Sequence, residues 1–311
     1  MMSVTVEQVI ERIPEWREKP ISVQPLPNGI TNVNYKVLVD NRPFFVRLPG
    51  HNSDLLGIDR CNEFFNNRVC SRLGIGPEVI HYFEDLGALV IEFLSFPALT
   101  PETLRQPGVQ RRLIRTVKIL HNGERFWRDF SMFRLADSYL DTIWERGLAL
   151  YPGVEEHLSH IAEIERAVRA NSVPTVPCHN DLIPGNILDQ GDRIFLVDFD
   201  YSGNNDPFFE LGNLSAESGF DEEEIGALVT AYLGRESGAK TARTHLHRIM
   251  SDAGWGLWGI IQAEISSIDF DFWNYGLERW ERAMGEMDSD NFERWLRLTR
   301  GTLSTPLSVS P

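Results

Sequence analysis

The chain has 311 residues, a formal net charge of −15 and a hydrophobic fraction of 42%. This length suffices to bury a substantial core and to form two lobes, and the apolar fraction is that of an ordinary globular protein. The negative charge argues against nucleic acid or an anionic membrane surface as a partner, and it is compatible with a cationic substrate.

No stretch of the sequence has the features of a targeting or membrane-spanning segment. The N-terminus lacks a basic segment followed by an apolar run, so we expect no signal peptide. The longest apolar stretches, near 88–94 and 255–263, are far shorter than the roughly 20 residues that cross a bilayer. The three cysteines have no disulfide or metal-ligand spacing. We therefore expect a cytoplasmic protein without membrane insertion.

The first 95 residues carry the pattern of a small antiparallel sheet with two helices. Apolar residues recur at helical spacing before Pro14, and apolar and polar residues alternate in the segments that follow. The predicted elements are a helix over 5–16, strands over 21–28, 33–39 and 44–48, a helix over 54–73, and strands over 79–83 and 88–93.

The rest of the chain is mostly helical, so the fold class is α+β. The linker 95–100 is the expected boundary between an N-terminal lobe, residues 1–95, and a C-terminal lobe, residues 96–311. Helices are predicted over 109–121, 136–150, 154–170, 221–233, 241–267, 273–287 and 291–300.

The stretch 177–213 interrupts these helices and contains the candidate chemistry. Asp181 is followed five residues later by Asn186, and the apolar run 195–197 reads as a strand that delivers Asp198. Phosphoryl transfer needs an acidic residue beside the attacking hydroxyl and oxygen ligands for magnesium beside the phosphates. Protein kinases meet this need with H-R-D-x-x-x-x-N and D-F-G. Asn180 stands here in place of the Arg and Asp200 in place of the Gly, so the pattern is not that of a protein kinase.

The ordered motifs resemble those of the choline/ethanolamine kinase family, a branch of the aminoglycoside-phosphotransferase-like kinases. The matching segments are His179-Asn180-Asp181 with Asn186, Val197-Asp198-Phe199-Asp200-Tyr201, and Leu211-Gly212-Asn213. The resemblance implies a two-lobe, protein-kinase-like fold that uses ATP and Mg²⁺. Asp181 would orient the substrate hydroxyl and accept its proton, and Asn186 and Asp198 would ligate magnesium.

The same resemblance implies a nucleotide site in the N-terminal lobe. The family has a phosphate-binding turn that corresponds to Gly29, Thr31 and Asn32, although Asn28 departs from the first glycine of that turn. Arg47 would grip the phosphates, and Glu63 would hold Arg47 by an ion pair; the alternative for Glu63 is a solvated helix face. The remaining expected nucleotide contacts are the hinge residues Glu92 and Leu94.

The aromatic stretch 255–275 is the expected substrate site. Trp255 and Trp258 share a helix face, which on its own is most often a sign of core packing. A quaternary ammonium has no N–H to donate, so aromatic faces and carboxylates are what bind it. By resemblance, Trp255, Trp258 and Phe272 would face the choline head, and Glu217 would lie near the ammonium.

The favoured interpretation is a kinase that phosphorylates the hydroxyl of choline, a small cationic amino alcohol. Ethanolamine, thiamine or an aminoglycoside are alternative substrates for the same fold. Ser218 and Glu264 stand where other family members have Trp and Lys, so the pocket shape stays open. The alternative of another class is a nucleotide-binding pseudokinase without catalysis.

Overall fold

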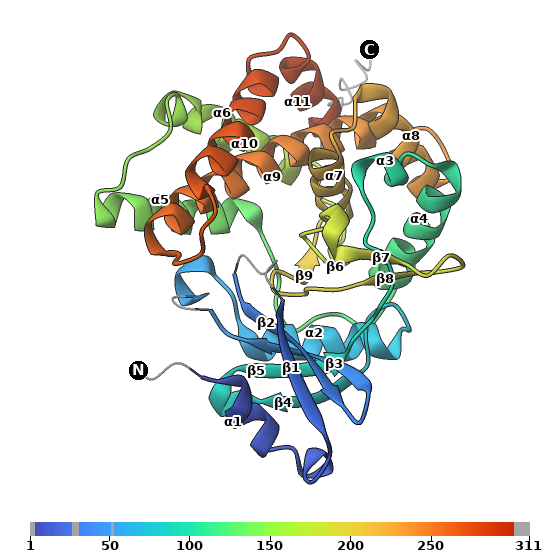
Figure 1. Ribbon diagram of the computed structural model, residues 1–311. Helices are drawn as coiled ribbons and strands as arrows, with labels where there is room; N and C mark the ends of the chain where they lie inside the picture. Colours follow the sequence, from blue (N-terminus) through green and yellow to red (C-terminus); the bar gives the residue numbers. More distant parts are fainter. Residues whose placement is uncertain (1–3, 27–30, 51–52, 302–311) are drawn as a thin grey trace, which may run out of the picture. The chain divides into compact units, whose positions relative to one another are not determined.

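The structure is a computed structural model that describes residues 4–26, 31–50 and 53–301 (Figure 1). By contact density the chain groups into two compact units. The first unit comprises residues 1–130, 177–204 and 264–270, and the second comprises 131–176, 205–263 and 271–311. The expected lobe boundary between residues 95 and 96 falls inside the first unit and stays a prediction.

The first unit contains a five-stranded sheet, helices that precede, interrupt and follow its strands in sequence, and the hairpin of the catalytic stretch. Its helices are α1 (Val6–Glu11), α2 (Arg60–Arg72), α3 (Pro101–Leu104) and α4 (Pro107–His121), with 3-10 turns at Pro14–Trp16, Ser53–Leu56, Glu84–Leu86 and Pro184–Asn186. Its strands are β1 (Ile21–Leu26), β2 (Val33–Val39), β3 (Arg42–Leu48), β4 (Val79–Phe83), β5 (Ala88–Glu92), β7 (Ile187–Asp189) and β8 (Ile194–Leu196).

The five-stranded sheet is antiparallel throughout, with the order β1-β2-β3-β5-β4, as the alternating patterns predict. Successive side chains of a strand point to opposite faces of a sheet. On β3, Val46 therefore joins the core cluster with Val9 of α1, whereas Arg47 points away from that cluster toward α2. This alternation places the buried guanidinium of Arg47 on the α2 side of the sheet.

The second unit is helical. Its helices are α5 (Met132–Arg146), α6 (Val154–Ala170), α7 (Pro207–Ser218), α8 (Glu222–Leu233), α9 (Gly238–Ile265), α10 (Phe272–Met287) and α11 (Phe292–Arg300). The short strands β6 (Val176–Cys178) and β9 (Gly203–Asn205) lie where the chain passes from one unit to the other. Among the described residues, no helix is both long and apolar enough to cross a membrane.

Two helices show the clearest differences between prediction and structure. The helix expected from residue 54 begins only at Arg60, because Gly57 has a positive φ of 75° and Asp59 caps the new helix through Cys61 N and Asn62 N. Helix α7 was not predicted, although Asp206 caps its start and Gly219 ends it in the left-handed conformation. Its sequence is buried nearly all round, so it lacks the one-sided apolar pattern.

Candidate functional site: a nucleotide pocket and an aromatic cluster

A cavity of about 310 Å³ lies between the sheet and the catalytic stretch, entirely within the first unit. This volume is in the range of small-molecule sites, about 300–1,000 Å³. Its wall includes most of the residues predicted to bind nucleotide or metal, namely Asn32, Arg47, Glu63, Glu92, Leu94, Asn186 and Asp198. Thr31 is not part of this wall, and Gly29 lies outside the described residues.

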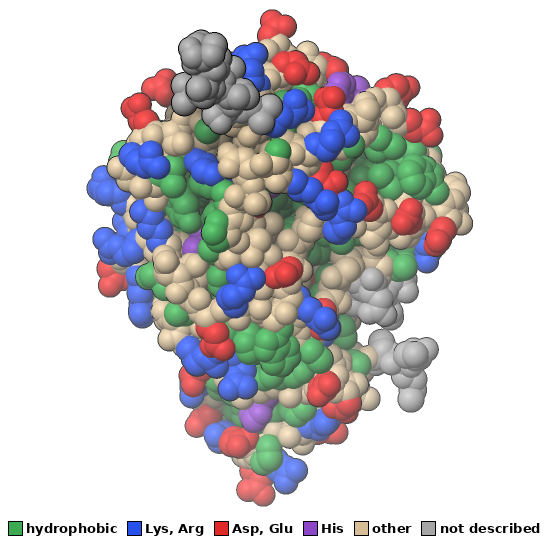
Figure 2. Space-filling view, turned by 180° about the vertical axis from the view of Figure 1, so that it is seen from behind, with side chains coloured by type: hydrophobic (Ala, Val, Ile, Leu, Met, Phe, Trp, Pro, Cys, Tyr) green, Lys and Arg blue, Asp and Glu red, His purple; other side chains and the backbone are tan. Residues whose placement is uncertain are grey.

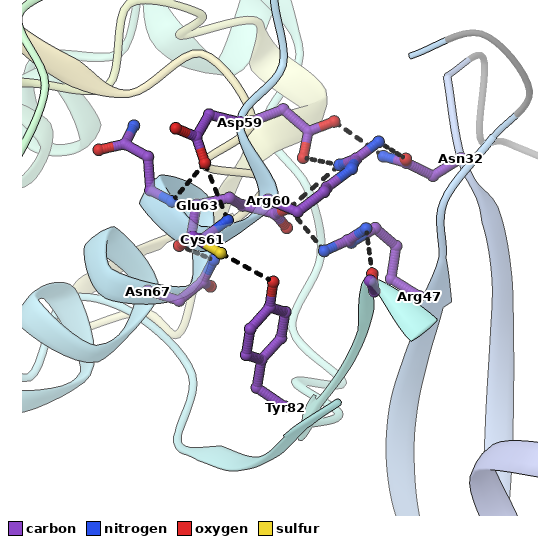
Figure 3. Close-up of polar contacts among 11 residues, drawn as sticks. Asn32, Arg47, Asp59, Arg60, Cys61, Glu63, Asn67 and Tyr82 are labelled. Atoms are coloured by element: carbon purple, nitrogen blue, oxygen red, sulfur yellow. Dashed lines mark hydrogen bonds and ion pairs between the residues drawn. The ribbon is translucent and has the colours of Figure 1, made fainter. Parts of the chain in front are cut away.

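Arg47 and Glu63 form the ion pair that the resemblance implies. Arg47 Nη2 donates to Glu63 Oε2 at 2.5 Å, and Nη1 donates to the Gly87 carbonyl at 3.2 Å (Figure 3). Both side chains are buried, so the solvated-face alternative for Glu63 is wrong. Burial raises the pKa of Glu63 to about 7, against the opposing effect of the Arg47 charge. The pair fixes a guanidinium in the cavity wall.

Arg60 connects Glu63 with Asp200 and Asn32, and its role was not predicted. Its Nη1 donates to Glu63 Oε2 at 3.0 Å and to Asp200 Oδ1 at 2.9 Å, and its Nη2 donates to Asn32 Oδ1 at 2.6 Å. Asn32 in turn donates to Asp200 Oδ2 at 2.9 Å. Figure 3 shows Arg60 reaching from α2 toward Asn32 on one side and Glu63 on the other. The signal in the sequence was its position three residues before Glu63 on one helix face.

The hinge residues Glu92 and Leu94 both line the cavity. The Glu92 N–H already donates to the Glu78 carbonyl at 2.8 Å, so this donor is committed to the sheet. Adenine bound here would therefore need an N–H group from the segment after Glu92, where Leu94 lies. Because a backbone N–H group would make such a contact, no side-chain pattern in the sequence could identify it.

The catalytic loop is braced by hydrogen bonds around Asp181. His179 Nε2 donates to the Val197 carbonyl at 2.9 Å, so the Asp181 N–H donates to the unprotonated Nδ1 at 3.3 Å. Asn186 Nδ2 donates to the Asp181 carbonyl at 3.0 Å. His179 thus braces the loop. Because Nδ2 of Asn186 is used in this way, its Oδ1 is the atom that would bind a cation.

Asp198 is held in a left-handed conformation with φ of 66°, and Asn180 in the same loop has φ of 67°. Such backbone is costly for a residue with a side chain, and it concentrates at functional sites. Asp198 is exposed on the cavity wall, yet the surrounding protein and the nearby carboxylates of Asp200 and Asp181 raise its pKa well above the usual value. Glu63 adds to the same effect.

The charges of this cluster fit a bound cation. Four carboxylates face two guanidiniums; the carboxylates are those of Glu63, Asp181, Asp198 and Asp200, and the guanidiniums are those of Arg47 and Arg60. Burial alone would raise the pKa of Asp200, but Arg60 and Arg47 hold it below its usual value. For Asp198 the opposing charge of Arg47 does not prevent the rise in pKa, so a magnesium ion with its preference for oxygen ligands would relieve the repulsion there.

The predicted substrate residues lie in the second unit and pack against one another. The Trp258 ring meets Trp255 edge to face at 6.4 Å between ring centroids, Phe272 at 5.7 Å and Tyr275 at 6.1 Å. Trp255, Trp258 and Phe272 are all buried. This burial fits a core role as well as a role in holding an ammonium group.

Glu217 has a partner that the sequence did not reveal. Arg279 Nη1 and Nη2 donate to its two carboxylate oxygens at 2.7 and 2.8 Å, and Nη2 also donates to Tyr275 Oη. Both members of the pair are buried. Burial would lower the pKa of Arg279, but Glu217 raises it well above its usual value. The fork geometry of the guanidinium uses both oxygens of Glu217.

The predicted site residues therefore form two groups, and all members of a group lie in the same unit. Asp181, Asn186 and Asp198 share the first unit with the nucleotide cavity. Glu217 and the aromatic rings belong to the second unit.

Comparison with known proteins points to one family. The model of the choline/ethanolamine kinase family matches residues 23–232. Ethanolamine kinase 2 of Mus musculus is 27% identical over 322 residues, covering 90% of this chain and 82% of the relative. Protein LicA of Haemophilus influenzae is 28% identical over 269 residues, covering 82% of this chain and 97% of the relative. The crystal structure of a choline/ethanolamine kinase family protein from Mesorhizobium loti has a TM-score of 0.81 and 29% identity, covering 94% and 97% of the two chains.

Proposed function

The chain belongs to the choline/ethanolamine kinase family, with the protein-kinase-like fold, and from this premise we propose that it phosphorylates the hydroxyl of choline. Membership makes it a phosphotransferase that acts on an alcohol group and uses ATP. The choice of choline, the need for Mg²⁺ and the role of each residue are our proposal.

The first unit provides the phosphoryl-transfer half of the site. Arg47, fixed by Glu63, binds the ATP phosphates, because a guanidinium grips phosphate oxygens with parallel hydrogen bonds. Asp181 orients the substrate hydroxyl and accepts its proton. Asn186 and Asp198 hold Mg²⁺, which would neutralise charge that develops on the transferring phosphoryl group.

The observation that favours choline is the state of Glu217. Both of its carboxylate oxygens accept hydrogen bonds from Arg279, so its negative charge is already balanced by a guanidinium. An ethanolamine ammonium carries three N–H donors that need acceptors when they leave water. A trimethylammonium group carries none, and faces of rings such as Trp258 suffice for it. The second unit is therefore better suited to a quaternary ammonium.

The test is ATP consumption by the purified protein with choline, ethanolamine, thiamine and an aminoglycoside, each across a concentration series. We expect the highest kcat/KM for choline and, in Asp181→Asn measured in parallel, a kcat lower by about 10²-fold or more. A higher kcat/KM for ethanolamine would overturn the substrate choice and leave the kinase chemistry intact. A nucleotide-dependent rise in melting temperature without turnover of any of these compounds would favour the pseudokinase alternative.

A further inference from the structure

A cluster of two histidines and an aspartate lies in the second unit, apart from the residues assigned to the kinase reaction. His157 and His160 are one helical turn apart near the start of α6, and Asp288 follows the end of α10. One ligand atom from each of the three lies within 4.8 Å of the others. The beginning of α6 also approaches α10 closely, since a Cβ on Gly153 would come within 2.5 Å of Met284 Sδ.

The hydrogen bonds of His157 fix which nitrogen faces the cluster. Nδ1 lies 2.8 Å from the Gly153 carbonyl, which can only accept, so Nδ1 carries the proton of the neutral ring. Nε2 then presents a lone pair, and it lies 3.1 Å from Asp288 Oδ1, which is also an acceptor. Two acceptors at this distance repel unless a cation, either a proton or a metal ion, lies between them.

His160 distinguishes the two cations. Its ring packs edge to face on Phe292 of α11 and lies 5.4 Å from the His157 ring, centroid to centroid. Its Nδ1 is buried and has no hydrogen-bond partner among the described residues. A proton shared by His157 and Asp288 would leave this nitrogen unsatisfied, whereas a metal ion can take a ring nitrogen of His160 as a third ligand.

We propose that His157, His160 and Asp288 form a binding site for a divalent transition metal of the zinc class. Two imidazoles and one carboxylate suit Zn²⁺, which is commonly held by nitrogen and oxygen ligands and completes a tetrahedron with water. Mg²⁺ prefers an all-oxygen shell, so the magnesium of the kinase reaction does not compete effectively. The Gly153 carbonyl fixes the orientation of the His157 ring, as carbonyl groups commonly do for metal-bound histidines.

The three residues are accessible to a metal ion from solvent, and a bound ion would connect two helices. The Asp288 side chain is 62% exposed and that of His157 is 13% exposed, so an ion can enter from solvent on the aspartate side. A bound metal would tie the start of α6 to the end of α10, the helix that begins at Phe272 and carries Arg279. We therefore expect zinc to stabilise the second unit.

The experiment titrates Zn²⁺ by calorimetry into the full-length, untagged protein, stripped of metal and kept in excess Mg²⁺. We expect one zinc ion per chain, with affinity lost by at least about tenfold in His160→Gln and in Asp288→Asn. His81→Gln is the matched control, because His81 also lies beside a carboxylate, that of Glu15 at 3.7 Å, but belongs to no cluster of three potential metal ligands in the described part of the chain.

Thermal unfolding supplies the second measurement. Zinc should raise the melting temperature of the wild type and of His81→Gln, and it should leave that of His160→Gln unchanged. His160→Gln removes a nitrogen that has no partner among the described residues, so without zinc we expect it to melt close to the wild type. Zinc binding that persists in both His160→Gln and Asp288→Asn, or wild type that binds no zinc, overturns the proposal. Both results are independent of choline phosphorylation.

Discussion

The two units treat buried charge in opposite ways. In the first unit, burial and the neighbouring carboxylates together raise the pKa of Asp198 well above its usual value, against the opposing charge of Arg47. In the second unit, Arg279 takes both oxygens of Glu217, and Arg282 takes both oxygens of Asp252. The acidic groups of the second unit are thus balanced by arginines of the same unit, whereas those around Asp198 are in excess.

The excess carboxylates of the first unit suit a site that binds cations, whereas the paired carboxylates of the second unit suit a structural role. An excess of carboxylates is tolerated beside a cavity if a metal ion and a polyphosphate enter together and neutralise each other. A paired carboxylate offers less to an incoming cation, because removing either member of a buried pair leaves the other charge uncompensated. Under the function proposed above, substrate recognition in the second unit would depend on ring faces, and the chemistry in the first would depend on charged side chains that can be substituted one at a time.

The largest effect should follow from removing the proposed base in the unbalanced unit. Asp181→Asn keeps the size of the side chain but cannot accept a proton, so we expect kcat to fall by about 10²-fold or more with ATP binding retained. Asp192→Asn is a control, since Asp192 is an exposed aspartate in the turn between β7 and β8. Steady-state kinetics and nucleotide binding measure the two effects, and near-normal turnover in Asp181→Asn would remove it from the mechanism.

A smaller effect should follow from Arg60→Met, which keeps the aliphatic length and removes the charge shared by Glu63 and Asp200. Charge-assisted hydrogen bonds of this kind are worth about 1.5–3 kcal/mol, so kcat/KM for ATP should fall by about 10- to 100-fold. The Mg²⁺ concentration for half-maximal activity should fall as well, because the cluster becomes more negative.

The matched control for this change is Arg72→Met on the same helix, where the side chain is half exposed and pairs with Glu124. We expect its kinetics to equal those of the wild type, since an exposed pair contributes little. If Arg60→Met raised the Mg²⁺ requirement instead, Arg60 would act by organising the metal ligands rather than by balancing their charge.

The sequence predicted what depends on neighbours along the chain. The strands β2 and β4 and the helix α6 have the predicted bounds, because these bounds depend on the apolar pattern within each segment. The spacing of Asp181 and Asn186 was also sufficient to predict that they share one loop. Family resemblance added the ion pair between Arg47 and Glu63, which the structure confirms.

What the sequence did not predict depends on partners far away in the chain. Asp200 lies 140 residues from Arg60, and Glu217 lies 62 residues from Arg279, so no local pattern connects either pair. Helix α7 was missed for a related reason, because surrounding segments bury all of its faces and erase its amphipathic pattern. Likewise, nothing in the sequence indicated that Arg279 pairs with Glu217, which the resemblance placed near the ammonium.

The smallest effect should come from the balanced unit, where binding depends on ring faces. Trp258→Leu keeps apolar volume but loses the π face toward the ammonium, so we expect choline binding to weaken by about 0.5–2 kcal/mol, with unchanged KM for ATP. Trp144→Leu is the control, since Trp144 is 51% exposed on α5. Choline KM, ATP KM and melting temperature should be measured together for both variants.

The three measurements separate the two roles that burial of Trp258 allows. If Trp258 serves only the core, Trp258→Leu should lower the melting temperature and reduce activity equally for every substrate, because it damages the packing with Phe272 and Tyr275. If the Trp258 ring faces the ammonium, Trp258→Leu should raise the KM for choline and leave the KM for ATP unchanged. A large melting decrease with unchanged choline KM would assign Trp258 to the core and would leave the paired state of Glu217 as the structural argument for choline.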